Sequence, residues 1–218
     1  MQALRIYAGP AARRHIAAHG LAPGDVGIVP AAAGGPKGLI LGPLDRFLFG
    51  QWLPASGHTV HLVGASIGAW RVATACLHQP VQAFERLERD YIAQDYELPP
   101  GQRTPTAAHV SQRFAQNLQA FFGGRIREVL EHPRFRLHIV TARGRHLLRR
   151  EHRIGTPLGY LGAFLANTLH RRAMRAWLER GVAGEAGSCA GGGAVKTERR
   201  TQRAQRAQRL RRRRRRKP

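Results

Sequence analysis

Residues 59–75 read TVHLVGASIGAWRVATA, and this stretch decides how the rest of the chain is interpreted. The β-branched and apolar run 59–63 predicts a strand, and the apolar run that follows predicts a helix. Between them lies Gly64-Ala65-Ser66-Ile67-Gly68, with the Gly-x-Ser-x-Gly spacing of a nucleophile elbow. Such an elbow holds its serine in a strained backbone conformation, and its glycines lack the Cβ atoms that would collide with strand and helix. Ser66 is therefore the predicted nucleophile, beside the free N–H groups of a helix N-terminus.

A second strand, loop and helix precede the elbow. Residues 26–29 predict a strand, and the apolar residues 39–53 predict a helix that is disturbed near Gly42-Pro43. The loop between them contains Gly34-Gly35-Pro36-Lys37-Gly38. Backbone N–H groups of such a loop can stabilise the oxyanion that forms when a serine attacks an ester, so this segment is the predicted oxyanion hole. A nucleotide-binding loop is the weaker interpretation, because Lys37 precedes Gly38 and no Ser or Thr follows.

Two such units in succession predict an α/β layered fold with a largely parallel sheet. We also expect strands over 4–7 and 135–141, and helices over 10–19, 84–92 and 110–122. A further helix carries Leu169, Ala173, Ala176 and Trp177 on one face and Arg171, Arg172, Arg175 and Arg180 on the rest. A basic amphipathic helix of this kind suits a membrane surface, although packing against protein with a solvated basic face is commoner.

The net charge of +23 is concentrated at the C-terminal end. Residues 196–218 hold 13 Lys and Arg against one Glu, which is a net +12 of that total. Apolar periodicity ends near Arg180, so we expect a Gly/Ala-rich and then Arg-rich disordered tail over 181–218. Its arginine run, 211–216, would bind DNA, RNA or anionic lipid without sequence specificity, because no aromatic residues are interleaved to stack on bases. A tail without a selected function is the alternative.

Several site types are not expected. Cys76 and Cys189 are too few for a disulfide framework, and the N-terminus has no signal-peptide pattern, which together predict a cytoplasmic protein. The longest uncharged apolar stretch, 155–169, is shorter than the roughly 20 residues of a membrane-spanning helix. His15 and His19 lie four residues apart without a third ligand nearby, so we expect no metal, and no cofactor either.

Histidines also lie close to the elbow in the sequence. His58 and His61 could act as a general base for Ser66. A packed or surface histidine is the commoner role in a strand of alternating polarity. The Ser–His pairing therefore stays the secondary interpretation.

The segments GGPKG and, about thirty residues later, GASIGAW resemble the patatin-like phospholipases, which are bacterial lipid acyl hydrolases. The resemblance continues more weakly over residues 1 to about 180, including TPLGYLGAF at 156–164. It implies a three-layer α/β/α fold, Ser66 as nucleophile and an oxyanion hole shaped by the Gly34–Gly38 loop. It further implies that the serine is paired with an aspartate and that the substrate is a lipid or another acyl ester, with peripheral membrane contact.

The sequence departs from the family pattern at the aspartate of that pair. The family places it in a downstream Asp-Gly-Gly or Asp-Gly-Ala segment, and no Asp follows Asp95 in this chain. We therefore expect residues 1–180 to be a patatin-like domain that is incomplete at its C-terminus, and 181–218 to resemble a GC-rich gene read out of frame. The alternative function is a non-catalytic protein whose basic tail binds nucleic acid or anionic membrane.

Overall fold

The computed structural model describes residues 4–94, 105–149, 152 and 154–184. The described residues form a mixed α/β structure with an open four-stranded sheet in the order β1-β2-β3-β4. The strands are β1 (Ile28–Ala31), β2 (Val60–Gly64), β3 (Phe135–Gly144) and β4 (Leu178–Gly184). The predicted α/β class is thus confirmed. The chain divides into two compact units, residues 1–137 and residues 138–218.

The pairing of the strands differs in part from the prediction. β1 and β2 pair in parallel, from Ile28 opposite His61 to Ala31 opposite Gly64. In contrast, β3 and β4 are antiparallel, with His138 opposite Gly184. The expected largely parallel sheet is corrected for this pair, because the segment between β3 and β4 joins them at one end instead of crossing back over the sheet.

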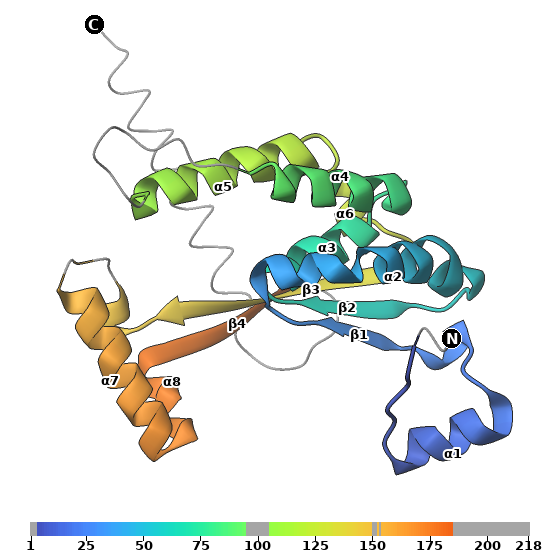
Figure 1. Cartoon of the computed structure of the whole chain (residues 1–218), viewed down its shortest axis with the longest axis horizontal. Helices are drawn as coiled ribbons and strands as arrows, with labels where there is room; N and C mark the ends of the chain where they lie inside the picture. Colours follow the sequence, from blue (N-terminus) through green and yellow to red (C-terminus); the bar gives the residue numbers. More distant parts are fainter. Residues whose placement is uncertain (1–3, 95–104, 150–151, 153, 185–218) are drawn as a thin grey trace, which may run out of the picture. The chain divides into compact units, whose positions relative to one another are not determined.

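In the first unit, α2 (Gly42–Phe47) and α3 (Ile67–Ala75) lie over one face of β1 and β2. This unit also contains α1 (Pro10–His19), α4 (Pro80–Ile92), α5 (Ala107–Phe122) and α6 (Ile126–Leu130). Figure 1 shows α2 and α3 above the two parallel strands. The core between them holds Leu62 and Val72, and the ring of Phe49 lies 5.9 Å from that of Phe84 and 6.0 Å from that of Phe135. This packing fixes the ends of β1 and β2 from which the site is built.

Local sequence signals explain most helix boundaries in this unit. Pro10 begins α1, and the α1 C-cap is Gly20 at φ 76°. The Thr106 hydroxyl caps α5 by accepting a hydrogen bond from the N–H of His109, and Gly123 ends the helix. The predicted helices over 10–19, 84–92 and 110–122 are therefore confirmed.

Two predicted elements take another form. Residues 4–7 form no strand, and Leu4 and Ile6 stay more than 60% exposed, because no neighbouring strand pairs with them. The apolar run 39–53 is a series of short turns around α2, with 3-10 helices at Gly35–Leu41 and Leu53–Ala55 and a π-helical turn at Leu48–Trp52. Pro43 has no backbone N–H to donate within a continuous helix, which explains the disturbance predicted near Gly42-Pro43.

The second unit contains α7 (Gly155–Leu169), α8 (Met174–Trp177) and the 3-10 turns His146–Arg149 and Arg171–Ala173. The single helix predicted to carry Leu169, Ala173, Ala176 and Trp177 on one face is wrong: α7 ends at Leu169, His170 is extended, and a 3-10 turn and α8 follow. The chain leaves α8 at Trp177 because the next residues enter β4 and pair with β3. This pairing includes a hydrogen bond from the Thr141 hydroxyl to the Gly181 carbonyl (3.2 Å). β4 continues to Gly184, past the boundary expected near Arg180, and the rest of the predicted tail lies outside the described residues.

Candidate active site

Ser66 lies at the turn between β2 and α3, as predicted, and its backbone is strained. Its φ of 54° and ψ of −128° are conformations that a residue with a Cβ rarely adopts. Among the described non-glycine residues, His146 alone shares a positive φ. The Ser66 side chain is exposed at the start of α3. This is the backbone geometry that presents a nucleophilic hydroxyl at the top of a strand.

The two elbow glycines are required by close backbone contacts. A Cβ on Gly68 would lie 2.2 Å from the carbonyl oxygen of Ala31, and one on Gly64 would lie 2.5 Å from the Cα of Ala69. The atoms in the way belong to backbone, which cannot move aside as a flexible side chain can. The N–H of Ala65 also donates to the Ala31 carbonyl (3.1 Å). The elbow therefore sits directly against the end of β1.

The predicted oxyanion loop lies at the same sheet edge. Gly34–Gly38 follow the carboxyl end of β1, and Ser66 follows the carboxyl end of its parallel neighbour β2. Gly35 has φ 57°, which favours glycine, and a Cβ on Gly38 would lie 2.9 Å from Cγ2 of Ile67. The loop thus contacts the residue that directly follows the serine. Pro36 and Lys37 are exposed on the same turn.

The N-terminus of α3 supplies backbone donors beside Ser66. The N–H groups of Gly68 and Ala69 are used within the turn, by the carbonyls of Ala65 and Ser66 (2.9 Å each). No acceptor among the described residues is found for the N–H of Ile67. In an elbow, the N–H of the residue after the nucleophile is one half of the oxyanion hole. The Ile67 N–H is thus a candidate oxyanion donor, and the Ile67 side chain lies against Gly38.

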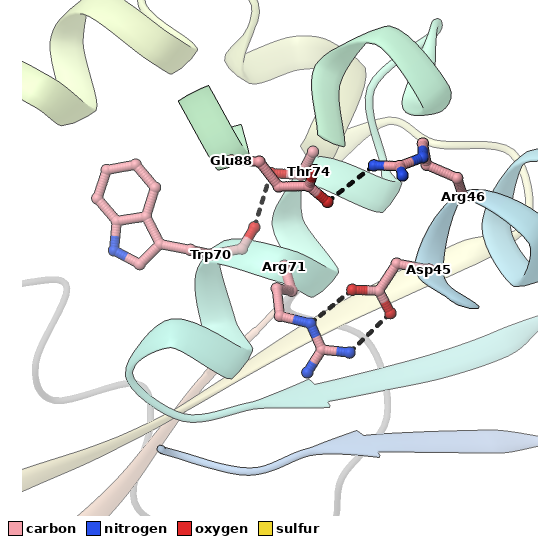
Figure 2. Close-up of polar contacts among 6 residues, drawn as sticks. All are labelled: Asp45, Arg46, Trp70, Arg71, Thr74 and Glu88. Atoms are coloured by element: carbon pink, nitrogen blue, oxygen red, sulfur yellow. Dashed lines mark hydrogen bonds and ion pairs between the residues drawn. The ribbon is translucent and has the colours of Figure 1, made fainter. Parts of the chain in front are cut away.

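A buried ion pair joins the helix after the Gly34–Gly38 loop to the helix after the elbow (Figure 2). The Arg71 guanidinium on α3 donates two hydrogen bonds to the Asp45 carboxylate on α2, at 2.6 and 2.7 Å. Both residues are at least nine-tenths buried. Burial raises the pKa of Asp45, and the charge and hydrogen bonds of Arg71 act in the opposite direction. The pair therefore holds the two motifs in register.

A second ion pair extends this network to α4. Arg46, next to Asp45, donates to the Glu88 carboxylate at 2.8 Å. On α3 the Thr74 hydroxyl donates to the Trp70 carbonyl, also at 2.8 Å, as Figure 2 shows. Sequence reasoning left this network out. The signal that could have revealed it is Arg71 itself, the single charge within the apolar run IGAWRVATACL.

The aspartates that the structure describes are engaged away from Ser66. Asp45 binds Arg71, Asp25 lies 3.0 Å from Nε2 of His15, and Asp90 pairs with Arg86. Asp95 lies outside the described residues. Among the described side chains, none forms a hydrogen bond with the Ser66 hydroxyl. The described part of the candidate site thus consists of the predicted nucleophile, Ser66, and the predicted oxyanion donors.

The other histidine and metal candidates are placed as follows. The two ring nitrogens of His58 contact the Ser56 hydroxyl (2.5 Å) and the Val26 carbonyl (2.8 Å), so this ring is not directed at Ser66. His61 lies half-buried on β2. His15 and His19 lie side by side on α1 with ring centroids 5.2 Å apart. Within the described ranges, no group of three His, Cys, Asp or Glu side chains is arranged to bind a metal.

The last features concern Cys76, the lengths of the helices and the comparisons with known proteins. Cys76 is buried in the core, where its thiol donates to the Val72 carbonyl (3.4 Å). In the described part of the chain, no helix combines the length and apolarity that crossing a membrane requires. Comparisons with protein-family models, with characterised proteins and with solved structures find no match to this chain.

Proposed function

We propose that this protein is a patatin-like serine acyl hydrolase that acts on ester-linked acyl groups of lipids, with Ser66 as nucleophile and a three-layer α/β/α fold. The observation that carries the proposal is the strained backbone of Ser66, at φ 54° and ψ −128°, on an exposed turn between a strand and a helix. Backbone strain at a non-glycine residue persists where the surroundings enforce it, and it concentrates at functional sites. Here the close contacts of Gly64 and Gly68 enforce it.

The geometry is compatible with the following reaction steps. The Ser66 Oγ attacks the carbonyl carbon of the ester while its hydroxyl proton passes to a base. The resulting oxyanion accepts hydrogen bonds from the Ile67 N–H and from N–H groups of the Gly34–Gly38 loop. The ester C–O bond then breaks, the alcohol leaves with a proton, and water hydrolyses the acyl-Ser66 ester to release the acid.

The described residues do not supply the base that accepts the proton of the Ser66 hydroxyl. An oxyanion hole with substrate binding alone still gives about 10³–10⁴-fold acceleration over water in serine hydrolases that have lost a triad member. We therefore expect slow acyl transfer, which an irreversible reagent detects better than turnover does.

Labelling with a fluorophosphonate probe tests the proposal. Folded wild-type protein is expected to form one adduct per chain, located at Ser66 by peptide mass spectrometry, and Ser66→Ala is expected to abolish it. Ser111→Ala is the matched control, because Ser111 is an exposed serine on α5 with ordinary helical geometry. Equal labelling of the wild type and of correctly folded Ser66→Ala would overturn the assignment.

A further inference from the structure

The helix α7 in the second unit is oriented with its small residues inward. A Cβ on Gly159 would lie 2.8 Å from Cδ2 of Leu148, and one on Gly162 would lie 2.7 Å from the ring of Trp177. Ala163 is buried on the same side. These small residues let the neighbouring turn and α8 approach the helix closely.

The large apolar side chains of α7 point the other way. They form what we call the α7 apolar face, and each of its members is more than half exposed: Leu158, Tyr160, Leu161, Phe164, Leu165 and Leu169. At the helical 3.6-residue period, Leu158, Leu161, Leu165 and Leu169 line up in one row. A surface helix normally buries its large apolar residues and exposes its small or polar ones. The contiguous apolar face of α7 therefore indicates an interaction surface.

The described segments that pack against α7 carry charge of one sign. Segments that contact α7 carry the exposed Arg149, Arg171, Arg172 and Arg175, and no charged residue interrupts 155–169. Within 138–149, 152 and 154–184, Glu179 is the single acidic residue, and it lies 3.5 Å from Arg145. No carboxylate in these ranges pairs with Arg171, Arg172 or Arg175.

We propose that the α7 apolar face and its neighbouring arginines bind an anionic lipid surface. Apolar side chains enter the boundary between headgroups and acyl chains, while arginines near the surface are attracted by the negative headgroups. A second copy of the chain is the less suitable occupant, because two faces with the same basic surroundings repel each other. The proposal concerns binding and does not require acyl transfer at Ser66. Lipid binding by a protein that is not labelled at Ser66 would contradict the proposed acyl hydrolase function and leave the lipid-binding proposal intact.

A site-specific probe tests this in the full chain, because the arginine-rich tail also binds polyanions. The test uses Leu165→Cys in a Cys189→Ser background, labelled with the environment-sensitive dye NBD. Cys76 is buried, so we expect the dye to label the introduced cysteine selectively. We expect a blue shift and a severalfold rise in emission on vesicles with about 30% phosphatidylserine, and much less on pure phosphatidylcholine. Ile92→Cys is the matched control, an exposed apolar position on α4 that should not respond.

The arginines are tested in the same labelled protein. Arg171→Gln with Arg172→Gln and Arg175→Gln should weaken the response on anionic vesicles by the order of a hundredfold, since each basic residue near such a surface contributes roughly fivefold. Vesicle pelleting without a change in the emission of the dye on α7 would mean binding by the tail alone and would overturn the proposal. An equal response on neutral vesicles, or a response to protein concentration without vesicles, would overturn it too, the latter in favour of a second copy.

Discussion

The helices α3 and α7 are both apolar in sequence, yet they have opposite fates. Seven of the nine residues of α3 are buried, whereas α7 buries Gly159 and Ala163 out of 15. The difference arises from the neighbours, since α3 lies against β1, β2 and α4, while α7 packs on short turns and the four-residue α8. Apolar composition therefore indicates that a helix needs a partner surface, and the surrounding elements decide whether the protein itself provides it.

The treatment of charge sharpens this contrast. The single charge of α3, Arg71, is enclosed and neutralised by Asp45, whereas α7 has no charge and meets arginines in the segments around it. Damage to the α3 region should therefore reduce folding stability, and damage to the outer face of α7 should reduce binding.

Removing Asp45 should have the largest effect. Asp45→Ala leaves the buried Arg71 guanidinium without a partner, so we expect a loss of about 3–5 kcal/mol in the free energy of unfolding, measured by urea denaturation. Asp90→Ala is the control, because its pair with Arg86 is exposed and such pairs contribute about 1 kcal/mol or less. Equal losses in the two variants would show that the buried pair does not hold α2 to α3. Asp45→Leu with Arg71→Met should recover most of the stability.

The second-largest difference between α3 and α7 is expected from alanine substitutions at their inward-facing glycines. Gly68→Ala places a Cβ 2.2 Å from the Ala31 carbonyl oxygen, so we expect a loss of about 3 kcal/mol together with displacement of Ser66. In Gly159→Ala the new Cβ lies 2.8 Å from Cδ2 of Leu148 and 3.2 Å from Cβ of Leu147, which are side-chain atoms and not backbone. The gain in helix propensity, about 1 kcal/mol, offsets these contacts. Thermal unfolding measures both. Similar losses in both variants would contradict the difference in packing.

Mild acid should produce the smallest difference. Burial, aided by the charges of Arg134 and Arg136, lowers the pKa of His132 to about 4, and its Nδ1 accepts the N–H groups of Arg134 and Phe135. The folded state favours the neutral ring, so this stability is present above pH 6.5 and is lost as the pH falls toward 4. Because His132 is only partly buried, we expect about 1–2 kcal/mol after solvent screening.

The His132→Asn variant is the control for this acid effect. Its amide oxygen can replace the Nδ1 acceptor without titrating, so urea unfolding at pH 7 and pH 4.5 should show a smaller acid loss. The Glu128 carboxylate titrates separately, since its hydrogen bond with Arg125 lowers its pKa to about 2. An unchanged acid loss in His132→Asn would assign the effect to other groups.

The candidate site was more predictable than the sheet around it. A nucleophile elbow is a local structure, so its spacing alone placed Ser66 between β2 and α3. The run 4–7 has the same apolar character as a strand, but it finds no partner. The antiparallel β3–β4 pair was also missed, because strand direction depends on where the connecting helices pack.

The sequence by itself determined the elbow, the glycine loop and the mixed α/β class, because glycine, proline and apolar spacing act over a few residues. Tertiary structure alone decided that Asp45 and Arg71, 26 residues apart, close into one buried pair, since a long-range contact has no local signature. It also decided that α3 is enclosed while α7 turns its large side chains outward. Both helices carry the apolar residues that a core requires, and only the elements packed around them settle which residues water still reaches.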